Sequence, residues 1–329
     1  LAAIYTPSAG DITVGNVTLT LSTDDPPGPC GVDSDPMVLT IDPAATASAG
    51  VDATICSNGT HTVSGTRGGN ASSSTWTTSG TGTFANASLV TTVYTPSAAD
   101  ISAGTVNLTI TTDDPAGQCT AASDVLTLTI DTEATINAGG DATICEGSAY
   151  TLAGSIGGGA SSSTWTTSGT GTFDDATIVN ATYTPSAADI SAGSITLTIT
   201  SDDPPGPCLS ATDNMILTIN LDPIAGAGAD VTICEGNSNT LSGSIGGGAS
   251  SSSWSTGGTG TFDNASLLAA TYTPSAADIT AGTVTLTLTT DDPPGPCVAA
   301  TNNMTITINE AATASAGADA TICEGVDHT

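Results

Sequence analysis

The residues best suited to chemistry in this sequence lie in the stretch TTDDPPGPC, Thr289–Cys297. Two adjacent carboxylates, Asp291 and Asp292, run into a proline-stiffened turn that ends on a cysteine. Carboxylates on a loop can bind calcium, and a cysteine can bind a metal, carry redox chemistry or form a disulfide. The stretch therefore predicts a metal site, a redox centre or a structural loop.

The same stretch occurs four times, and this repetition decides between the three interpretations. STDDPPGPC, TTDDPAGQC and TSDDPPGPC end at Cys30, Cys119 and Cys208, so the four cysteines are 89 residues apart. A second series with the same spacing is Cys56, Cys145, Cys234 and Cys323. A fixed period of this kind outranks other sequence signals. It predicts complete copies at 44–132, 133–221 and 222–310, with 1–43 the C-terminal part of a copy and 311–329 the N-terminal strand of another. We expect the chain to be a segment of a longer array.

The residue types that catalysis needs do not recur with the repeat. The chain has one Arg (Arg67), no Lys, and two histidines, His61 and His328, at unrelated positions of the copy. Without a CxxC pair or recurring histidines, zinc and haem sites are not expected. A reactive cysteine needs a nearby basic group to lower its pKa, and none recurs. We therefore predict a protein that is not an enzyme.

Disulfides remain for the cysteines, and three pairings are open. Neighbouring copies could be joined, for example Cys145–Cys297, or two cysteines could meet across a joint, as in Cys119–Cys145. Pairs within a copy would each close a loop of 63 residues, worth roughly 4 kcal/mol in the chain-entropy model. A plain immunoglobulin topology favours pairing between neighbours, whereas independent folding of each copy favours pairing within it. We predict the within-copy pairs Cys56–Cys119, Cys145–Cys208 and Cys234–Cys297.

The paired aspartates are the candidate metal ligands, and calcium is the one cofactor they suggest. Calcium takes six to eight oxygen ligands, often from loop carboxylates. Asp before Pro is also an ordinary way to begin a turn, and the sequence contains no calcium loop of the D-x-D-x-D-G type. The candidate calcium ligands are Asp113, Asp114, Asp202, Asp203, Asp291 and Asp292.

Charge restricts the partners and the compartment. With 32 acidic residues and a formal net charge of −31, the surface repels nucleic acid and anionic lipid. No apolar stretch is long enough to cross a membrane, so neither nucleic-acid binding nor membrane insertion is expected of this segment. Eight cysteines in a chain rich in threonine and without lysine indicate an oxidising, extracellular compartment.

Alternation of apolar and threonine residues predicts β-strands. The stretch SITLTIT places Ile195, Leu197 and Ile199 on one face and threonines on the other, the period of a strand with one buried face. Further strands are expected at Met215–Asn220, Asp141–Cys145, Ala149–Gly154, Ser163–Ser168, Gly169–Phe173 and Ile178–Thr184. About seven short strands per copy predict an all-β fold, a linear array of immunoglobulin-like β-sandwiches.

Two segments depart from this pattern. In TPSAADISAG, Thr184 can cap a helical turn, Pro185 suits its first position and Gly193 can end it. The glycine-rich segment Gly154–Ser163 has no Lys and no helix after it, so a loop between strands is predicted instead of a phosphate-binding loop.

Each copy has one set of large aromatic residues, and two roles are open for it. An aromatic trio could stack on sugars, but a small sandwich needs a few bulky side chains to fill its core, and no others are present. We predict that these residues form the core: Trp76, Phe84, Tyr94, Trp165, Phe173, Tyr183, Trp254, Phe262 and Tyr272.

The motifs TICEG, YTPSAADI and DDPxGxC, which span the whole chain, resemble a known family. They are similar to the PKD-like tandem repeats of very large surface proteins in gliding Bacteroidetes, of which the SprB-type gliding motility adhesins are the best-known relatives. The resemblance implies immunoglobulin-like domains, export by the type IX secretion route and a role in adhesion or gliding.

Together these features predict a structural repeat region of a cell-surface or extracellular filament protein, acting as a stiff stalk. Its expected partners are neighbouring repeats of the same chain, other copies in a filament, and a surface polysaccharide. Two alternatives are open: a multivalent array that binds glycans or calcium with avidity, and a spacer of a secreted enzyme.

Overall fold

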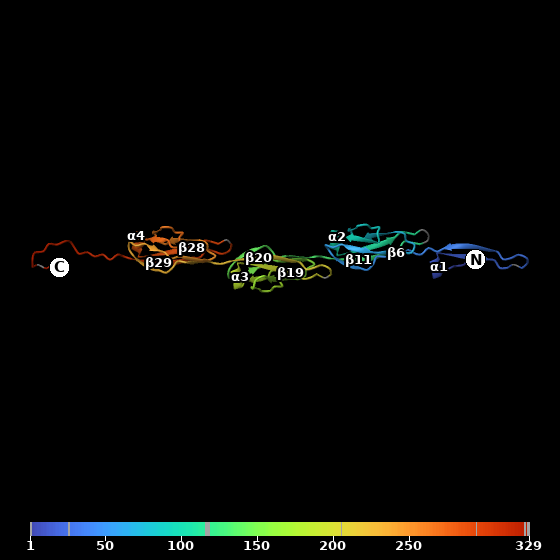
Figure 1. Ribbon diagram of the computed structural model, residues 1–329, viewed down its shortest axis with the longest axis horizontal. Helices are drawn as coiled ribbons and strands as arrows, with labels where there is room; N and C mark the ends of the chain where they lie inside the picture. Colours follow the sequence, from blue (N-terminus) through green and yellow to red (C-terminus); the bar gives the residue numbers. More distant parts are fainter. Residues whose placement is uncertain are drawn as a thin grey trace. The chain divides into compact units, whose positions relative to one another are not determined.

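The computed structural model describes residues 2–25, 27–115, 119–204, 206–293, 295–325 and 327. Parts of the repeated Asp-Pro loop (26, 116–118, 205 and 294) and His328 lie outside the described residues. The fold is almost entirely β, with one short helix in each copy, which confirms the predicted all-β class of tandem immunoglobulin-like sheets (Figure 1). No helix in the described ranges has the length and apolar character needed to cross a membrane.

The main sheet of the copy at 44–132 has four strands in the order β4-β11-β10-β7. These strands are β4 (Ala53–Cys56), β7 (Ser74–Thr78), β10 (Thr105–Thr112) and β11 (Ser123–Asp131). β10 pairs antiparallel with β11 and β7, whereas β4 pairs parallel with β11. Val106, Leu108 and Ile110 of β10 are buried because alternate residues of a strand share a face. The sheet therefore has one apolar face and one face rich in threonine.

A second layer of short strands accompanies this sheet. β3 (Thr46–Ser48) pairs with β6 (Thr66–Gly68), and β9 (Thr91–Thr95) lies between β5 (His61–Ser64) and β8 (Thr83–Phe84). The helix α2 (Ala98–Ala103) connects β9 to β10. Sheets of this kind, packed over a common core, form a sandwich.

The copy at 222–310 repeats this arrangement. Its main sheet has the order β22-β29-β28-β25, and its smaller sheets are β21-β24 and β23-β27-β26. The bounds are β21 Pro223–Gly226, β22 Val231–Cys234, β23 Asn239–Thr240, β24 Ser244–Gly247, β25 Ser252–Thr256, β26 Thr261–Phe262, β27 Thr271–Thr273, α4 Ala276–Ala281, β28 Thr283–Thr290 and β29 Thr301–Asn309.

The copy at 133–221 has the same order of elements. They are β12 Ala134–Asn137, β13 Ala142–Cys145, β14 Tyr150–Thr151, β15 Ser155–Gly158, β16 Ser163–Thr167, β17 Thr172–Phe173, β18 Thr182–Thr184, α3 Ala187–Ala192, β19 Ser194–Ser201 and β20 Thr212–Asn220. At the N-terminal end, α1 (Ala9–Val14) precedes β1 (Asn16–Ser22) and β2 (Ser34–Thr40).

Two local predictions need correction. The segment Gly154–Ser163 is not a loop throughout, because Ser155–Gly158 forms β15 and pairs with β12. The helical turn is capped by Ser186, not by Thr184: the Ser186 hydroxyl accepts a hydrogen bond from the Asp189 N–H, and the Asp189 carboxylate accepts one from the Ser186 N–H. This reciprocal capping box begins the helix two residues later than expected. Gly193, with φ 76°, ends it as predicted.

The aromatic residues lie in the centre of the copies. Trp76, Trp165 and Trp254 are 2%, 2% and 3% exposed. Tyr94, Tyr183 and Tyr272 are fully buried, and the phenylalanines are half-buried. Phe84 packs against both neighbours, with its ring centre 5.9 Å from that of Trp76 and 4.9 Å from that of Tyr94. Their burial leaves these rings unavailable as a flat platform for sugars.

The described chain divides into two compact units. One contains Leu1–Asn137, Ser155–Thr164 and Ile199–Asp213; the other contains Ala138–Gly154, Trp165–Thr198 and Asn214–Thr329. The copy at 133–221 thus contributes to both units, and the division of the chain at 43, 132, 221 and 310 stays a prediction.

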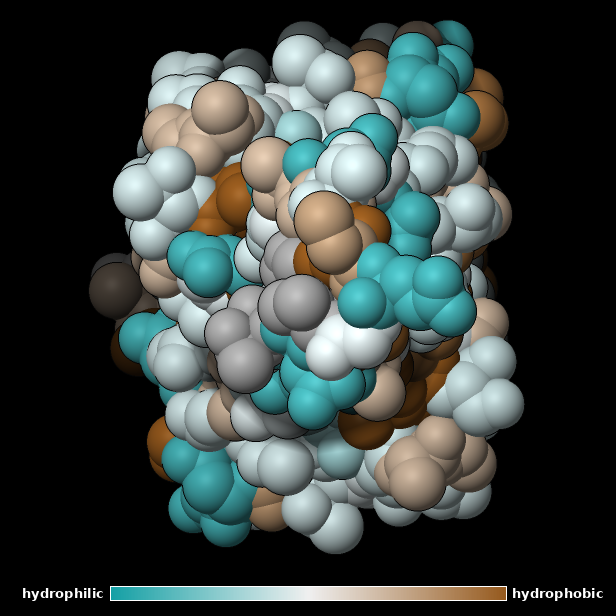
Figure 2. Space-filling model, turned by 90° about the vertical axis from the view of Figure 1, so that its left-hand side faces the viewer, coloured by the Kyte–Doolittle hydropathy of each residue, from teal (hydrophilic) through white to brown (hydrophobic). Residues whose placement is uncertain are grey.

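One face of the molecule, shown in Figure 2, is largely pale, with small separate groups of hydrophilic and hydrophobic residues and no large apolar patch.

Candidate functional site at the joints between copies

The joint after the copy at 44–132 brings two chain segments side by side. β4 runs parallel to β11, and the register places Cys56 level with Asp131, the last residue of β11. Only residues 132 and 133 separate β11 from β12. Parallel strands end at the same edge of a sheet, so Cys56 lies where the backbone leaves the copy.

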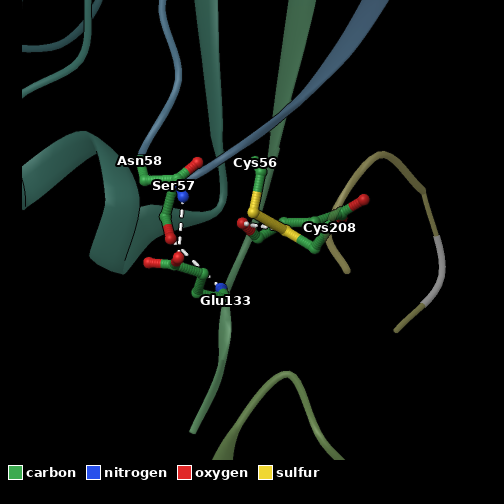
Figure 3. The surroundings of a disulfide bond; sticks show 6 residues. Cys56, Ser57, Asn58, Glu133 and Cys208 are labelled. Atoms are coloured by element: carbon green, nitrogen blue, oxygen red, sulfur yellow. Dashed lines mark hydrogen bonds between the residues drawn. A yellow bond between two sulfur atoms is a disulfide. The ribbon is translucent and has the colours of Figure 1, made fainter. Parts of the chain in front are cut away.

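A disulfide links Cys56 to Cys208, which belongs to the next copy and lies in the loop after β19 (Figure 3). The two Cα atoms are 5.0 Å apart, within the usual range for a disulfide. The Sγ atom of Cys208 lies 3.4 Å from the carbonyl oxygen of Asp131. Gly206, with φ 90°, permits this approach, because a Cβ atom there would lie 2.0 Å from the Asp131 carboxylate. The repeated loop therefore reaches back to the preceding copy.

The second compact unit contains the same joint one copy later. Cys145 ends β13 level with Asn220, the last residue of β20, and forms a disulfide with Cys297. The Cα atoms are 5.4 Å apart, and Cys208 and Cys297 are each 2% exposed. Cys30, Cys119, Cys234 and Cys323 are unpaired.

The predicted within-copy pairs Cys56–Cys119, Cys145–Cys208 and Cys234–Cys297 are therefore wrong. In the copy at 44–132, Cys56 lies level with the end of β11, whereas Cys119 precedes its start. The nine residues of β11 span about 30 Å, far beyond the 7 Å limit between disulfide Cα atoms. β29 separates Cys234 from Cys297 in the same way.

Polar contacts support the disulfide at the first joint. The Asn58 amide donates to the Glu133 carboxylate at 2.7 Å, the Glu133 N–H donates to the Ser57 hydroxyl at 3.1 Å, and the Ser57 N–H donates to the Asp131 carbonyl at 2.8 Å (Figure 3). These bonds tie the turn after Cys56 to the residues that open the next copy. The joint is therefore held by a covalent link and by a local hydrogen-bond network.

At the second joint an aspartate takes the place of Glu133. The Asp222 carboxylate lies within 4.8 Å of the sulfur atoms of Cys145 and Cys297, the one such grouping of potential metal ligands among the described residues. Both sulfur atoms are bonded to each other, so they offer no thiolate to a metal. This grouping results from the disulfide and does not indicate a metal site.

The paired aspartates have two different environments. The first aspartate of each pair accepts hydrogen bonds from a serine-rich loop, which in the copy at 133–221 follows β15. Asp202 accepts from the N–H groups of Ser161 and Ser162 at 2.9 and 3.0 Å and from the Ser161 hydroxyl. These bonds, the hydroxyl first, lower the pKa of Asp202. Asp113 and Asp291 bind the equivalent serines.

The second aspartate of each pair, Asp114, Asp203 and Asp292, is exposed. The first aspartate of each pair thus braces the serine loop, whereas the second is exposed to solvent. Calcium binding by these six residues stays a prediction.

A third aspartate is buried in each of the three complete copies and accepts several hydrogen bonds. Asp278 is 4% exposed, and Asp100 and Asp189 are its equivalents. Its carboxylate accepts hydrogen bonds from the Tyr272 hydroxyl at 2.9 Å, the Ser275 N–H at 2.9 Å and the Thr259 N–H at 3.0 Å. It therefore ties the β25–β26 turn, β27 and α4 together.

These hydrogen bonds decide the ionisation of Asp278. Burial alone would raise its pKa, but the bonds from Ser275, Thr259 and Tyr272 outweigh burial and lower the pKa to about 2. Asp100 and Asp189 are shifted in the same way. The sequence signal that could have identified this residue is Ser-x-x-Asp at the start of the helical turn, six residues after a core tyrosine.

We expect the stabilisation from Asp278 to be lost as the pH falls below about 4. The ordinary pKa of an unfolded aspartate is near 3.9, and the folded value is about 2, so the unfolded chain takes up the proton first. The contribution is fully present above the unfolded pKa and disappears as the pH falls through the folded one. With a discount for nearby solvent, it amounts to about 1–2 kcal/mol.

Urea unfolding of the wild type and of Asp278→Asn, followed from pH 7 to about pH 2, checks this expectation. Taking the difference between the two proteins cancels the effect of the changing net charge. The difference should shrink below about pH 4. A difference for Asp278→Asn that stays constant over this range would contradict the assignment.

Comparison with known proteins assigns the chain to no family. No protein-family model and no curated protein matches the chain. Among solved structures, a three-domain fragment of titin (I67–I69, an E-to-A variant) is similar with a TM-score of 0.46 and 14% identity, covering 83% of this chain and 100% of that one. A fragment of human CDH23 (EC21-23) is similar with a TM-score of 0.41 and 14% identity, covering 80% and 99%. Likeness at this level supports no inference about function.

Proposed function

We propose that this chain is a non-catalytic structural segment of an extracellular or bacterial cell-surface filament or adhesin, in which each 89-residue copy is one immunoglobulin-like domain. The observation that carries the proposal is the pairing of Cys56 with Cys208 and of Cys145 with Cys297. Each pair joins one copy to the next, so the covalent support is placed at the joints and not inside the domains.

The joints are built to restrict bending. Two residues separate β11 from β12, and two separate β20 from β21. A disulfide runs beside each of these short backbone links, and two parallel links leave less freedom of rotation than one. In repeat proteins, stiffness depends on such contacts between neighbours. A stiff stalk is the function that uses this feature.

Charge and cysteine chemistry support the rest of the proposal. Disulfides persist in oxidising compartments, in agreement with an extracellular location. A net charge of −31 makes nucleic acid and anionic membranes poor partners. The partners we propose are neighbouring repeats, further copies in a filament and a surface polysaccharide. Adhesion or gliding in a Bacteroidetes cell, with export by the type IX route, rests on the sequence resemblance.

Small-angle X-ray scattering and negative-stain images of the oxidised chain test the stalk. We expect a narrow distribution of elongated, beaded particles. The double variant Cys56→Ser/Cys145→Ser should give a broader distribution with bent particles. The matched control Cys119→Ser/Cys234→Ser removes two unpaired cysteines and should leave the distribution unchanged. Globular particles for the oxidised chain would refute the stalk.

A further inference from the structure

We propose that the two disulfides form a covalent bypass that carries tension past most of the copies at 44–132 and 222–310 and limits how far the chain can be stretched. This inference rests on the proposed stalk function and specifies how the stalk would bear load. It follows from which cysteines are paired and from where they lie in the strands.

At each joint the backbone and the disulfide leave the copy at the same level of the sheet. The backbone leaves the copy at 44–132 after Asp131, and the disulfide leaves it at Cys56, which lies level with Asp131 in the sheet. At the next joint the corresponding pair is Asn220 and Cys145. Two covalent connections therefore cross each joint side by side, and a pulling force can pass through either of them.

The paired cysteines lie along the chain in the order 56, 145, 208 and 297. The loop closed by Cys56–Cys208 and the loop closed by Cys145–Cys297 overlap between residues 145 and 208. The shortest covalent path from residue 56 to residue 297 crosses the first disulfide, follows the chain back to residue 145 and crosses the second. That path contains 63 residue steps, whereas the backbone between the same residues contains 241.

The number of residues in this path sets its greatest length. A fully extended chain spans about 3.3–3.6 Å per residue. Between residues 56 and 297, the oxidised chain can therefore extend to about 22 nm even when every strand has unfolded, and the reduced chain to about 80 nm. The disulfides therefore reduce the maximum extension by about 60 nm. The segments 57–144 and 209–296 are not part of the shortest covalent path.

Overlapping loops have a signature that independent loops lack. When one disulfide is removed, the other still provides a path of 89 steps, so either single loss adds only 26 steps, about 9 nm. Loss of both adds 178 steps, about 60 nm. If the two loops did not overlap, loss of each disulfide would instead release the full length of its own loop, and the two gains in contour length would add.

Single-molecule pulling on the whole chain, held at its two ends, measures these lengths. We expect the contour length after complete unfolding to increase by about 9 nm for Cys145→Ser or for Cys56→Ser, and by about 60 nm for the double variant or after reduction. Cys119→Ser and Cys234→Ser, which remove unpaired cysteines, should change nothing.

Two results would overturn the bypass. One is an oxidised chain that reaches the full length of the reduced chain. The other is a gain of about 22 nm for Cys119→Ser, which is the length of a 63-residue loop within one copy. Either result leaves the stalk intact if the scattering and images still show elongated particles, so the two proposals can fail separately.

Discussion

Replacement of Cys145 by serine should lower the free energy of unfolding of the two copies that it joins by about 3–5 kcal/mol. The disulfide to Cys297 closes a loop with a sequence separation of 152, for which the chain-entropy model gives about 5 kcal/mol. Native-state relaxation and residual structure in the unfolded chain reduce the measured value below that limit. The effect is large because the crosslink closes a long loop.

Urea unfolding monitored by the fluorescence of Trp165 and Trp254 measures this loss in the two joined copies. Cys297→Ser should reproduce the effect, and the double variant should be no less stable than either single variant, because both remove one bond. Cys234→Ser is the matched control, since this cysteine is unpaired. Equal unfolding midpoints for wild type and Cys145→Ser, under conditions that keep the wild type oxidised, would show that the joint disulfide does not stabilise the fold.

Replacement of Asp278 by alanine should destabilise the copy at 222–310 by about 3–5 kcal/mol. The change leaves the N–H groups of Ser275 and Thr259 and the Tyr272 hydroxyl without the acceptor that now binds them. Hydrogen bonds to a charged group are worth about 1.5–3 kcal/mol each, and unsatisfied buried donors carry an additional cost.

Thermal unfolding of Asp278→Ala beside Asp292→Ala separates the buried aspartate from an exposed one. We expect a clear loss of stability for the first and a change within about 0.5 kcal/mol for the second. Asp278→Asn keeps the size of the side chain and should fall between them. Similar unfolding temperatures for Asp278→Ala and Asp292→Ala would mean that the network around the buried carboxylate is dispensable.

The strands and their faces could be predicted because they depend on local pattern. Alternation in SITLTIT placed Ile195, Leu197 and Ile199 together, and all three are buried in β19. The helical turn was also predictable, but its first residue was not, because both Thr184 and Ser186 can act as a cap. Only the position of Asp189, three residues after Ser186, distinguishes them.

The disulfide pairing could not be deduced from spacing. It depends on the parallel pairing of β4 with β11 and of β13 with β20, which connects strands far apart in the sequence. This register places Cys56 and Cys145 at the end of a copy opposite to its own Asp-Pro loop. The sequence shows the cysteines and their period. Only the tertiary structure decides at which end of a strand each cysteine lies.

The roles of the aspartates could not be predicted from the sequence either. Asp278 and Asp291 recur with the same period, and nothing in the period distinguishes a buried carboxylate from a loop brace. The buried one has its hydrogen-bond donors in β27, in the turn before β26 and at the start of α4. The brace has its donors in a serine loop 41 residues earlier. Both roles require the folded arrangement to bring the donors together.

Disulfide mapping tests most directly that the crosslinks join successive copies. Cleavage after glutamate alone divides the chain at Glu133, Glu146, Glu235, Glu310 and Glu324, so Cys145 lies in the short peptide 134–146. After the free thiols are blocked and the unreduced chain is digested, this peptide should be joined to 236–310, which contains Cys297, and 1–133 should be joined to 147–235. If 134–146 is instead joined to 147–235, which contains Cys208, the crosslinks lie within the copies and the account of the joints is wrong.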